Sequence, residues 1–200
     1  MLIWFAIFLY ALLLLALVYV WIDIIRLFIS RRYRQCPPLV PSFGRQKKVM
    51  IEKISAELKQ NRQPLNVLDP GCGTGTLLIA LAGKFPDHNF TGIEWNRITA
   101  AIASFRTRKL KNVRILRQDM FDFSFAEFDI IACFLMQPLM ERFGTKLKKE
   151  CRPGTTVYSN SFYIPGEKAA EVIEVKGFYK FNNVYTVSYT HLTLPTTSRV

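Results

Sequence analysis

Acidic residues and histidines are scarce in this chain of 200 residues, which contains 15 Asp and Glu, two His and 27 Lys and Arg. The cysteines form neither a CxxC pair nor a metal spacing with histidine, so we expect no metal site. They fit buried thiols in a reducing compartment. No Gly-Lys-Ser/Thr sequence follows the glycine-rich stretch 71–75, which excludes the P-loop of nucleoside triphosphate enzymes. The four cysteines are Cys36, Cys72, Cys133 and Cys151.

The start of the chain lacks charge altogether. Leu2 to Ile22 is a 21-residue stretch without a charged residue. At ~1.5 Å rise per residue, a helix of this length covers a hydrocarbon core of ~30 Å. A signal peptide would show a basic start, a shorter apolar run and a small-x-small cleavage site, and this stretch shows none of these. We therefore expect a permanent, single-pass transmembrane anchor.

Arginines follow this anchor directly, and no positive charge precedes it. The positive-inside rule then places the N-terminus outside and the rest of the chain in the cytoplasm. Beside anionic headgroups, these arginines account for part of the net charge of +12 without a nucleic acid. They are Arg26, Arg31, Arg32 and Arg34.

Beyond residue 43, short apolar runs typical of strands alternate with helical patterns. This alternation predicts an α/β fold with a mostly parallel sheet and helices on both faces. In such sheets the ligand lies at the carboxyl ends of the strands, where the strand order reverses. After the first strand, which ends at Asp69, we expect strands at 90–94, 113–116, 128–134 and 156–158, a closing pair at 171–175 and 184–187, and helices at 49–58, 77–82, 98–110 and 136–149.

The stretch 67–76 combines an apolar run, an acid and glycines at every second position. It predicts a strand, a tight turn and a helix N-terminus in series. Glycines let the backbone approach a bulky ligand, because a Cβ would hold it away. The free N–H groups at the helix start then face that ligand. We interpret the stretch as the cofactor site of an enzyme.

Three acids fall at the carboxyl ends of consecutive predicted strands: Asp69, Glu94 and Asp119. An acid inside the glycine turn would repel a pyrophosphate, but it suits a ligand with an ammonium group. S-adenosylmethionine has that group, a ribose and an adenine, and no phosphate. Asp69 would then face its methionyl end, Glu94 its ribose hydroxyls and Asp119 its adenine amino group. A nicotinamide dinucleotide stays open as the alternative.

Residues 40–187 resemble a class I S-adenosylmethionine-dependent methyltransferase. The resemblance rests on Asp69-x-Gly71-x-Gly73-x-Gly75, Gly92-Ile93-Glu94, Gln118-Asp119 and Arg152-Pro153-Gly154. It implies a Rossmann-like sheet and S-adenosylmethionine as cofactor. The cofactor-binding residues expected under it are Asp69, Gly71, Cys72, Gly73, Gly75, Glu94, Trp95, Asp119 and Met120.

A narrower resemblance covers most of the chain. The anchor, Val40-Pro41-Ser42, the segment 133–140 and the segment 159–165 resemble the small, membrane-anchored protein lysine methyltransferases of mitochondria. Those enzymes modify ATP synthase subunit c or the adenine nucleotide carrier, and they have archaeal and bacterial relatives. The resemblance implies protein lysine N-methylation. The family's Pro-x-Trp after the fifth strand is replaced here by Pro165-Gly166-Glu167, which leaves the acceptor open.

The fourth predicted strand ends in Cys133-Phe134-Leu135. These residues would give the site an apolar edge, which suits the methylene chain of a lysine. Methyl transfer needs alignment and exclusion of water rather than a strong acid or base, so it requires no Ser/His/Asp arrangement. For Gln137, Asn160 and Ser161, a role as a helix cap or strand end stays open. The residues expected to position the acceptor are Phe134, Gln137, Asn160 and Ser161.

Seven basic residues lie between Arg97 and Arg117, a density that would suit RNA. No aromatic residue interleaves with them from Thr107 to Arg117, so they form no stacking platform for single strands. We therefore expect no nucleic-acid partner and interpret this stretch as a solvated or membrane-facing surface.

These patterns divide the chain into four segments. We expect a transmembrane anchor (1–30), a basic, proline-rich linker (31–43), a methyltransferase domain (44–188) and a non-native tail (189–200) similar to a translated sequencing adaptor. The expected function is methylation of protein lysine at the cytoplasmic membrane surface. Methylation of a lipid or small molecule, and a non-catalytic cofactor-binding scaffold, stay open as alternatives.

Overall fold

The computed structural model describes residues 2–29, 44–175 and 183–189. The chain divides into two compact units, Met1–Pro38 and Leu39–Val200. The expected linker, with Arg31, Arg32, Arg34 and Cys36, lies outside the described residues, as does the expected tail from position 190 onward.

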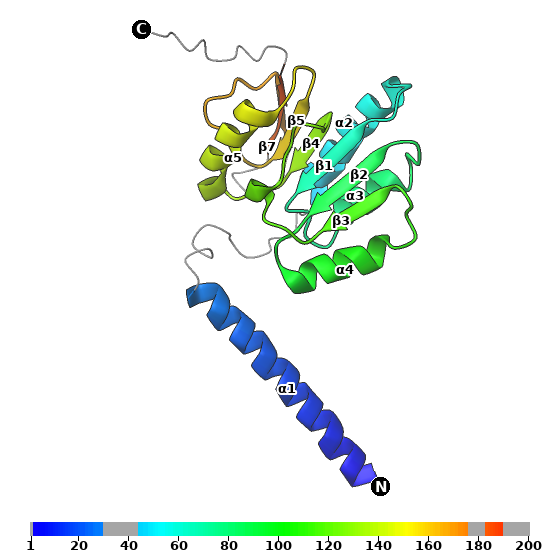
Figure 1. The fold of residues 1–200 in the computed structure, drawn as a ribbon, viewed down its shortest axis with the longest axis vertical. Coiled ribbons are helices and arrows are strands. Elements are labelled where there is room, and N and C mark those ends of the chain that lie inside the picture. Colours follow the sequence, from blue (N-terminus) through cyan, green and yellow to red (C-terminus); the bar gives the residue numbers. More distant parts are fainter. Residues whose placement is uncertain (1, 30–43, 176–182, 190–200) are drawn as a thin grey trace. The chain divides into compact units, whose positions relative to one another are not determined.

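The first unit contains one long helix, α1 (Leu2–Ile29), shown in blue in Figure 1. Its segment Ile3–Ile24 has 22 residues, a mean hydropathy of 2.6 and no buried residue. By length and composition this segment is able to cross a membrane, and a signal sequence near an N-terminus meets the same test.

The described part of the second unit contains a seven-stranded sheet with the order β3-β2-β1-β4-β5-β7-β6. The strands β1 to β5 are parallel, and β7 is antiparallel to both of its neighbours. The strand order reverses between β1 and β4, as expected for a ligand-binding α/β sheet. The strands are β1 (Asn66–Pro70), β2 (Asn89–Ile93), β3 (Val113–Leu116), β4 (Ile130–Cys133), β5 (Thr156–Asn160), β6 (Glu171–Glu174) and β7 (Asn183–Ser188).

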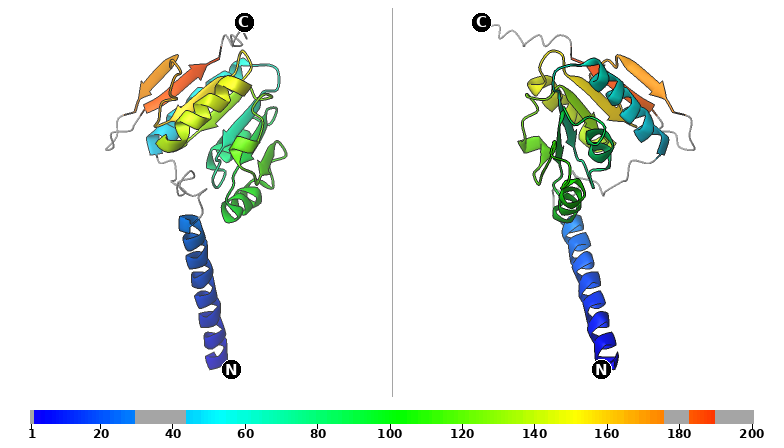
Figure 2. Two further views of the ribbon diagram at one scale, coloured as in Figure 1. Left: turned by 60° about the vertical axis from the view of Figure 1, so that its left-hand side comes forward. Right: turned by 90° about the vertical axis from the view of Figure 1, so that its right-hand side faces the viewer.

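Helices cover both faces of this sheet (Figures 1 and 2), which confirms the predicted fold class. On one face, α2 packs against α3, which in turn packs against α4. The opposite face is covered by α5 (Figure 2). The helices are α2 (Gly44–Gln60), α3 (Thr76–Ala82), α4 (Arg97–Thr107) and α5 (Gln137–Glu150), with a 3-10 turn η2 (Met120–Asp122) after β3.

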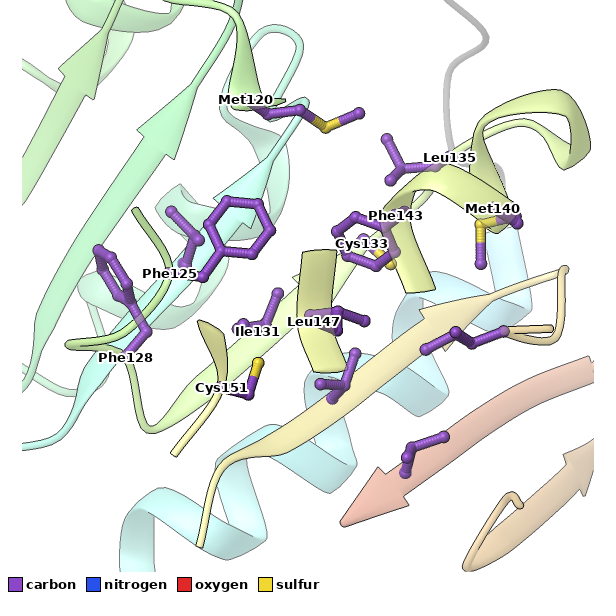
Figure 3. Close-up of a cluster of buried hydrophobic side chains, with 14 of the residues drawn as sticks. Met120, Phe125, Phe128, Ile131, Cys133, Leu135, Met140, Phe143, Leu147 and Cys151 are labelled. Carbon is purple, nitrogen blue, oxygen red and sulfur yellow. The ribbon is translucent and has the colours of Figure 1, made fainter. Parts of the chain in front are cut away.

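Successive strand residues feed two separate cores, because side chains alternate across a sheet. Val67 joins the core under α2, α3 and α4, whereas Leu68 joins the core under α5. Figure 3 shows the second core, in which Phe143 and Leu147 of α5 pack over Ile131 and Cys133 of β4. Continuous apolar strands such as Ile130–Cys133 therefore reflect burial on both faces.

The predicted elements differ from the observed ones mainly at their ends. The helix predicted over 98–110 is α4, Arg97–Thr107, because Asn96 caps it. The Asn96 Oδ1 accepts hydrogen bonds from the backbone N–H of Ile98 at 3.0 Å and of Thr99 at 3.1 Å. The strand predicted over 128–134 is the shorter β4, Ile130–Cys133.

Gly92 of β2 has no room for a side chain, so we expect Gly92→Ala to destabilise the protein. An added Cβ would lie 2.6 Å from Leu78 Cδ1 and 2.8 Å from Cys72 Sγ. Such overpacking costs about 1–3 kcal/mol, or a fall in Tm of roughly 2–10 °C in a thermal melt. Gly83→Ala is the matched control, because its Cβ would lie 3.5 Å from Ile79 O at an ordinary φ of −68°. Equal Tm values for the two variants would contradict this packing argument.

Candidate active site

The acids predicted at the strand ends lie at one edge of the sheet. Asp69 is in β1, Glu94 follows β2 and Asp119 follows β3. Because these three strands are parallel neighbours in the order β3-β2-β1, their carboxyl ends meet at the same edge. The residues predicted for the acceptor lie at or just after the ends of β4 and β5, at this edge as well.

The glycine turn between β1 and α3 has a backbone that only glycine adopts readily. Gly71 has φ +100° and Gly75 has φ +75°, both in the left-handed region. The turn is held against β2, because the N–H groups of Gly71 and Cys72 donate to Ile93 O at 2.8 and 2.9 Å. An added Cβ on Gly71 would also lie only 3.2 Å from Leu135 Cδ2, so the loop after β4 closes against the turn.

Glu94 connects the glycine turn to α4. One carboxylate oxygen accepts the N–H of Gly73 at 3.1 Å, and the other accepts the N–H of Asn96 at 2.8 Å. The side chain is buried, and this burial raises its pKa, while the backbone N–H groups of Asn96 and Gly73 oppose the rise. Each carboxylate oxygen has two acceptor positions, so both can still accept a hydroxyl.

Asp69 is a buried acid near the end of β1. Its residue is 6% exposed, and no hydrogen bond from the described residues reaches its carboxylate oxygens. Burial, and then the charge of Glu94, raise the pKa of Asp69 to about 8. A buried acceptor in this position calls for a cationic donor, which is what the ammonium of an amino-acid ligand offers.

The residues after β3 and β2 form the opposite end of the site. Asp119 Oδ1 accepts the N–H of Phe121 at 3.0 Å and so caps the η2 turn. Met120 is buried at the rim of the core under α5, across from Leu135 in Figure 3. Trp95 is 36% exposed directly after Glu94. These side chains place apolar surface beside an acceptor oxygen, which are the two features that an adenine requires.

The residues predicted to position the acceptor lie at the ends of β4 and β5. Phe134 is half-buried, and Gln137 is exposed as the first residue of α5. Asn160 is 1% exposed and its Oδ1 accepts the Ser161 hydroxyl at 3.0 Å, while its Nδ2 donates to no described residue. Ser161 has φ +72°, a costly conformation for a residue other than glycine and one that clusters at functional sites.

Two supporting contacts were not predicted from the sequence. Arg106 of α4 donates to Thr74 in the glycine turn, at 2.9 Å to the carbonyl oxygen and 3.0 Å to Oγ1. The Ser159 hydroxyl donates to Phe162 O at 2.6 Å and so fixes the loop after β5. The Cys133 thiol beside Ser159 is fully buried, which raises its pKa to about 12 and makes it unsuitable as a nucleophile.

Comparison with known proteins gives consistent matches over this domain. The family described as ANTKMT methyltransferase domain matches residues 69–171. A protein-lysine N-methyltransferase of Saccharolobus islandicus is 31% identical over 151 residues, covering 74% of this chain and 92% of that protein.

The chain belongs to the ANTKMT methyltransferase domain family.

Two further similarities are more limited. A tRNA (guanine-N(7)-)-methyltransferase of Mycoplasma mobile is 34% identical over 74 residues, or 36% of this chain and 35% of that protein. An RNA methyltransferase of Salinibacter ruber, crystallised with S-adenosyl-L-homocysteine, has a TM-score of 0.61 at 19% identity and covers 75% of this chain and 94% of that structure. The structural match supports the class I methyltransferase fold.

The protein is therefore an S-adenosylmethionine-dependent methyltransferase of class I. The site fits this cofactor on two counts. Asp69 is a buried acceptor that lacks a donor among the described residues, and Gly71 and Gly75, both left-handed, present no side chain at their positions in the turn. The predicted cofactor is confirmed, whereas the roles of individual site residues stay predictions.

The methyltransferase should bind its cofactor more tightly as pH rises from 6 to 8. Asp69 is protonated below its raised pKa of about 8, and it must lose this proton before it accepts an ammonium group. The affinity should therefore increase by up to about tenfold per pH unit and level off near the pKa. Titration calorimetry in buffers of different ionisation enthalpy should show proton release on binding. An affinity that stays constant across this range would exclude the proposed role of Asp69.

Proposed function

We propose that this methyltransferase transfers a methyl group to the side-chain nitrogen of lysine in a protein at a membrane surface. The observation that carries the proposal is its similarity to the Saccharolobus islandicus protein-lysine N-methyltransferase, which extends over 92% of that protein. The apolar end of β4 and the polar end of β5 support it, because a lysine has an apolar stem and a polar tip.

In this proposal the residues on the cofactor side bind and orient S-adenosylmethionine. Asp69 holds the methionyl ammonium, the Glu94 carboxylate accepts the ribose hydroxyls and Asp119 accepts from the adenine. When bound, S-adenosylmethionine supplies a methyl group on a positively charged sulfur. The glycine turn, held against Ile93 O, would let the backbone come close to the cofactor, because Gly71, Gly73 and Gly75 have no Cβ.

The acceptor-side residues keep water away and align the amine. A free lysine has a pKa of ~10.4, and an apolar environment lowers it and favours the neutral, nucleophilic form. Phe134 and the buried Leu135 provide this environment at the end of β4. Asn160 offers an amide beside it to orient the amine, and its carbonyl oxygen is fixed by Ser161 Oγ at 3.0 Å.

Removing the Asn160 amide should slow methyl transfer without loss of the cofactor. We expect Asn160→Ala to reduce kcat by about tenfold, the cost of one hydrogen bond in a buried site, and to leave the cofactor Kd within about twofold. Single-turnover kinetics and calorimetry measure the two quantities. If the Kd instead rises with kcat unchanged, Asn160 belongs to the cofactor side.

The membrane location is also part of this proposal. The apolar segment Ile3–Ile24, which has no buried residue and Asp23 as its one charged residue, would span the bilayer, and the arginines after it would keep the methyltransferase domain in the cytoplasm. Cells expressing the full chain should retain it in the membrane fraction after an alkaline wash. Release of the chain by that wash would contradict the anchor.

The acceptor class can be tested with the full chain in detergent, labelled S-adenosylmethionine and a membrane extract. We expect label in a protein band, and none with the Glu94→Ala variant. Label in the organic phase would instead assign a lipid acceptor. Label that becomes soluble after nuclease treatment would assign RNA, the acceptor of the partly similar tRNA methyltransferase.

A further inference from the structure

Helix α4 has its apolar residues on the side that faces away from the protein. Ala100, Ala103 and Thr107 are buried against the rest of the fold. At about 100° per residue, Ile98, Ile102 and Phe105 fall on the opposite side of the helix. Their exposed fractions are 42%, 43% and 64%. A surface helix normally has polar residues on this side, so the pattern calls for a partner that covers it.

The surroundings of this apolar stripe are strongly and uniformly basic. No acidic residue occurs between Glu94 and Asp119. The seven basic residues in this interval are all exposed, and none of them is in an ion pair among the described residues. They are Arg97, Arg106, Arg108, Lys109, Lys111, Arg114 and Arg117.

Two arginines flank the stripe directly. By helical position, Arg97 lies on one side of it. Arg108 lies on the same side, with its guanidinium carbon 3.8 Å from the centre of the Phe105 ring, and it donates to Phe105 O at 2.7 Å. The stripe is thus an apolar centre with a cationic border.

We propose that α4 lies on a bilayer surface that contains anionic lipids, with Ile98, Ile102 and Phe105 inserted at the boundary between headgroups and acyl chains. An apolar helix face bordered by arginines and lysines is the composition of a helix that lies in this interface. The basic residues would contact lipid phosphates, and such contacts add affinity for an anionic leaflet. This inference extends the proposed membrane location, but it depends on α4 and not on α1.

The charge and shape of the surface favour lipid over other partners. A second copy of the chain would bring the same seven positive charges to the interface, which opposes a symmetric contact through this face. A nucleic acid would meet one ring on this stripe, that of Phe105, and the Arg108 guanidinium already lies over it at 3.8 Å. The other two side chains, Ile98 and Ile102, are aliphatic and offer bases no stacking surface. An anionic bilayer satisfies both the apolar centre and the cationic border.

The proposed contact also places the active site near the lipid surface. Helix α4 starts three residues after Glu94, and Arg106 connects its other end to the glycine turn through Thr74. If α4 lies on the bilayer, the edge of the sheet that contains the active site would therefore be close to membrane proteins.

The test uses the full chain reconstituted in vesicles, with the photoreactive residue p-benzoylphenylalanine in place of Phe105. The matched control carries it in place of Val172, which is 50% exposed on β6, at the opposite edge of the sheet from β3. In phosphatidylcholine–phosphatidylglycerol vesicles, we expect roughly tenfold more lipid adduct at position 105 than at position 172. The double substitution Arg97→Glu and Arg108→Glu should reduce the adduct at 105 at least about fivefold. Cofactor affinity of every variant serves as the test of folding.

Equal lipid adducts at the two positions would overturn the inference, and so would adducts at 105 with a second chain or with added RNA. An adduct that is unchanged in pure phosphatidylcholine would overturn its electrostatic part. Alkaline washing of the same vesicles reports on α1 independently. If the wash extracts the chain while the adduct at 105 persists, the anchor fails and the α4 contact stands.

Discussion

Glu94→Ala is expected to weaken S-adenosylmethionine binding by at least about 100-fold, because the change removes hydrogen bonds to a charged group worth about 1.5–3 kcal/mol each. Two losses combine in this variant. The ribose hydroxyls lose their acceptor, and the N–H groups of Gly73 and Asn96 lose theirs, so the glycine turn loses its connection to α4. Calorimetric titration of the purified chain measures the change.

Two companion variants separate these effects. Glu94→Gln keeps one acceptor oxygen and should lose less affinity than Glu94→Ala. Glu52→Ala removes an exposed acid of α2, whose only described ion pair is a 4.0 Å contact with Lys48, and should leave the affinity unchanged. A Glu94→Ala variant that binds the cofactor as tightly as the Glu52→Ala control would show that the site is wrongly placed.

Asp69→Asn should have opposite effects on cofactor binding and on stability. Without the carboxylate the ammonium loses its counter-charge, and we expect the affinity at pH 8 to fall by about 100-fold, the upper range for a buried charged hydrogen bond. An amide does not titrate, so the pH dependence of the affinity between pH 6 and 8 should disappear.

The same substitution should stabilise the cofactor-free protein at pH 8. The pKa of Asp69 is raised in the folded state from 3.8 to about 8, so between these values the folded chain holds a proton that the unfolded chain has released. The free energy of unfolding therefore declines as pH rises through this window. Asparagine avoids the decline, and Tm at pH 8 should rise by at least about 2–4 °C, the equivalent of 1 kcal/mol. At pH 4 the two proteins should have the same Tm. An Asp69→Asn variant that is less stable than the original protein at pH 8 would contradict the burial argument.

Local sequence patterns were sufficient to predict the fold and the edge of the sheet at which the candidate site lies. The apolar run before Asp69, the glycines after it and the acids at 94 and 119 are separated by short, regular connections, so strand ends could be placed within a few residues. Because parallel strands present their carboxyl ends together, the gathering of these acids followed from chain order alone.

The contacts that complete the site could not be predicted, because they join residues far apart in the sequence. The Arg106 contact with Thr74 spans 32 positions and depends on how α4 crosses α3. Ser161 has a left-handed backbone, but the sequence has a serine there and not the glycine that usually indicates such a turn. The loop after β5 lacks the expected tryptophan, and it packs on α5 through the buried Ile164, whose Cγ2 would lie 2.9 Å from a Cβ on Gly144.

The apolar stripe of α4 illustrates a different limit. Helical spacing groups Ile98, Ile102 and Phe105 on one side, and an apolar side of a helix usually faces the core. In the fold, the small residues Ala100 and Ala103 form the buried side, because α4 packs closely over α3 and β3. Which side of an amphipathic helix is buried depends on its neighbours, and these are known only from the three-dimensional arrangement.

The decisive measurement of protein lysine methylation is the chemical identity of the methylated product. The full chain should be incubated with labelled S-adenosylmethionine and a membrane extract, and the labelled protein hydrolysed to amino acids. If the protein methylates lysine, the label should elute with ε-N-methyllysines and should be absent when the Glu94→Ala variant is used. Label in methylarginine, in a volatile methyl ester, or only in the lipid or RNA fraction would contradict it.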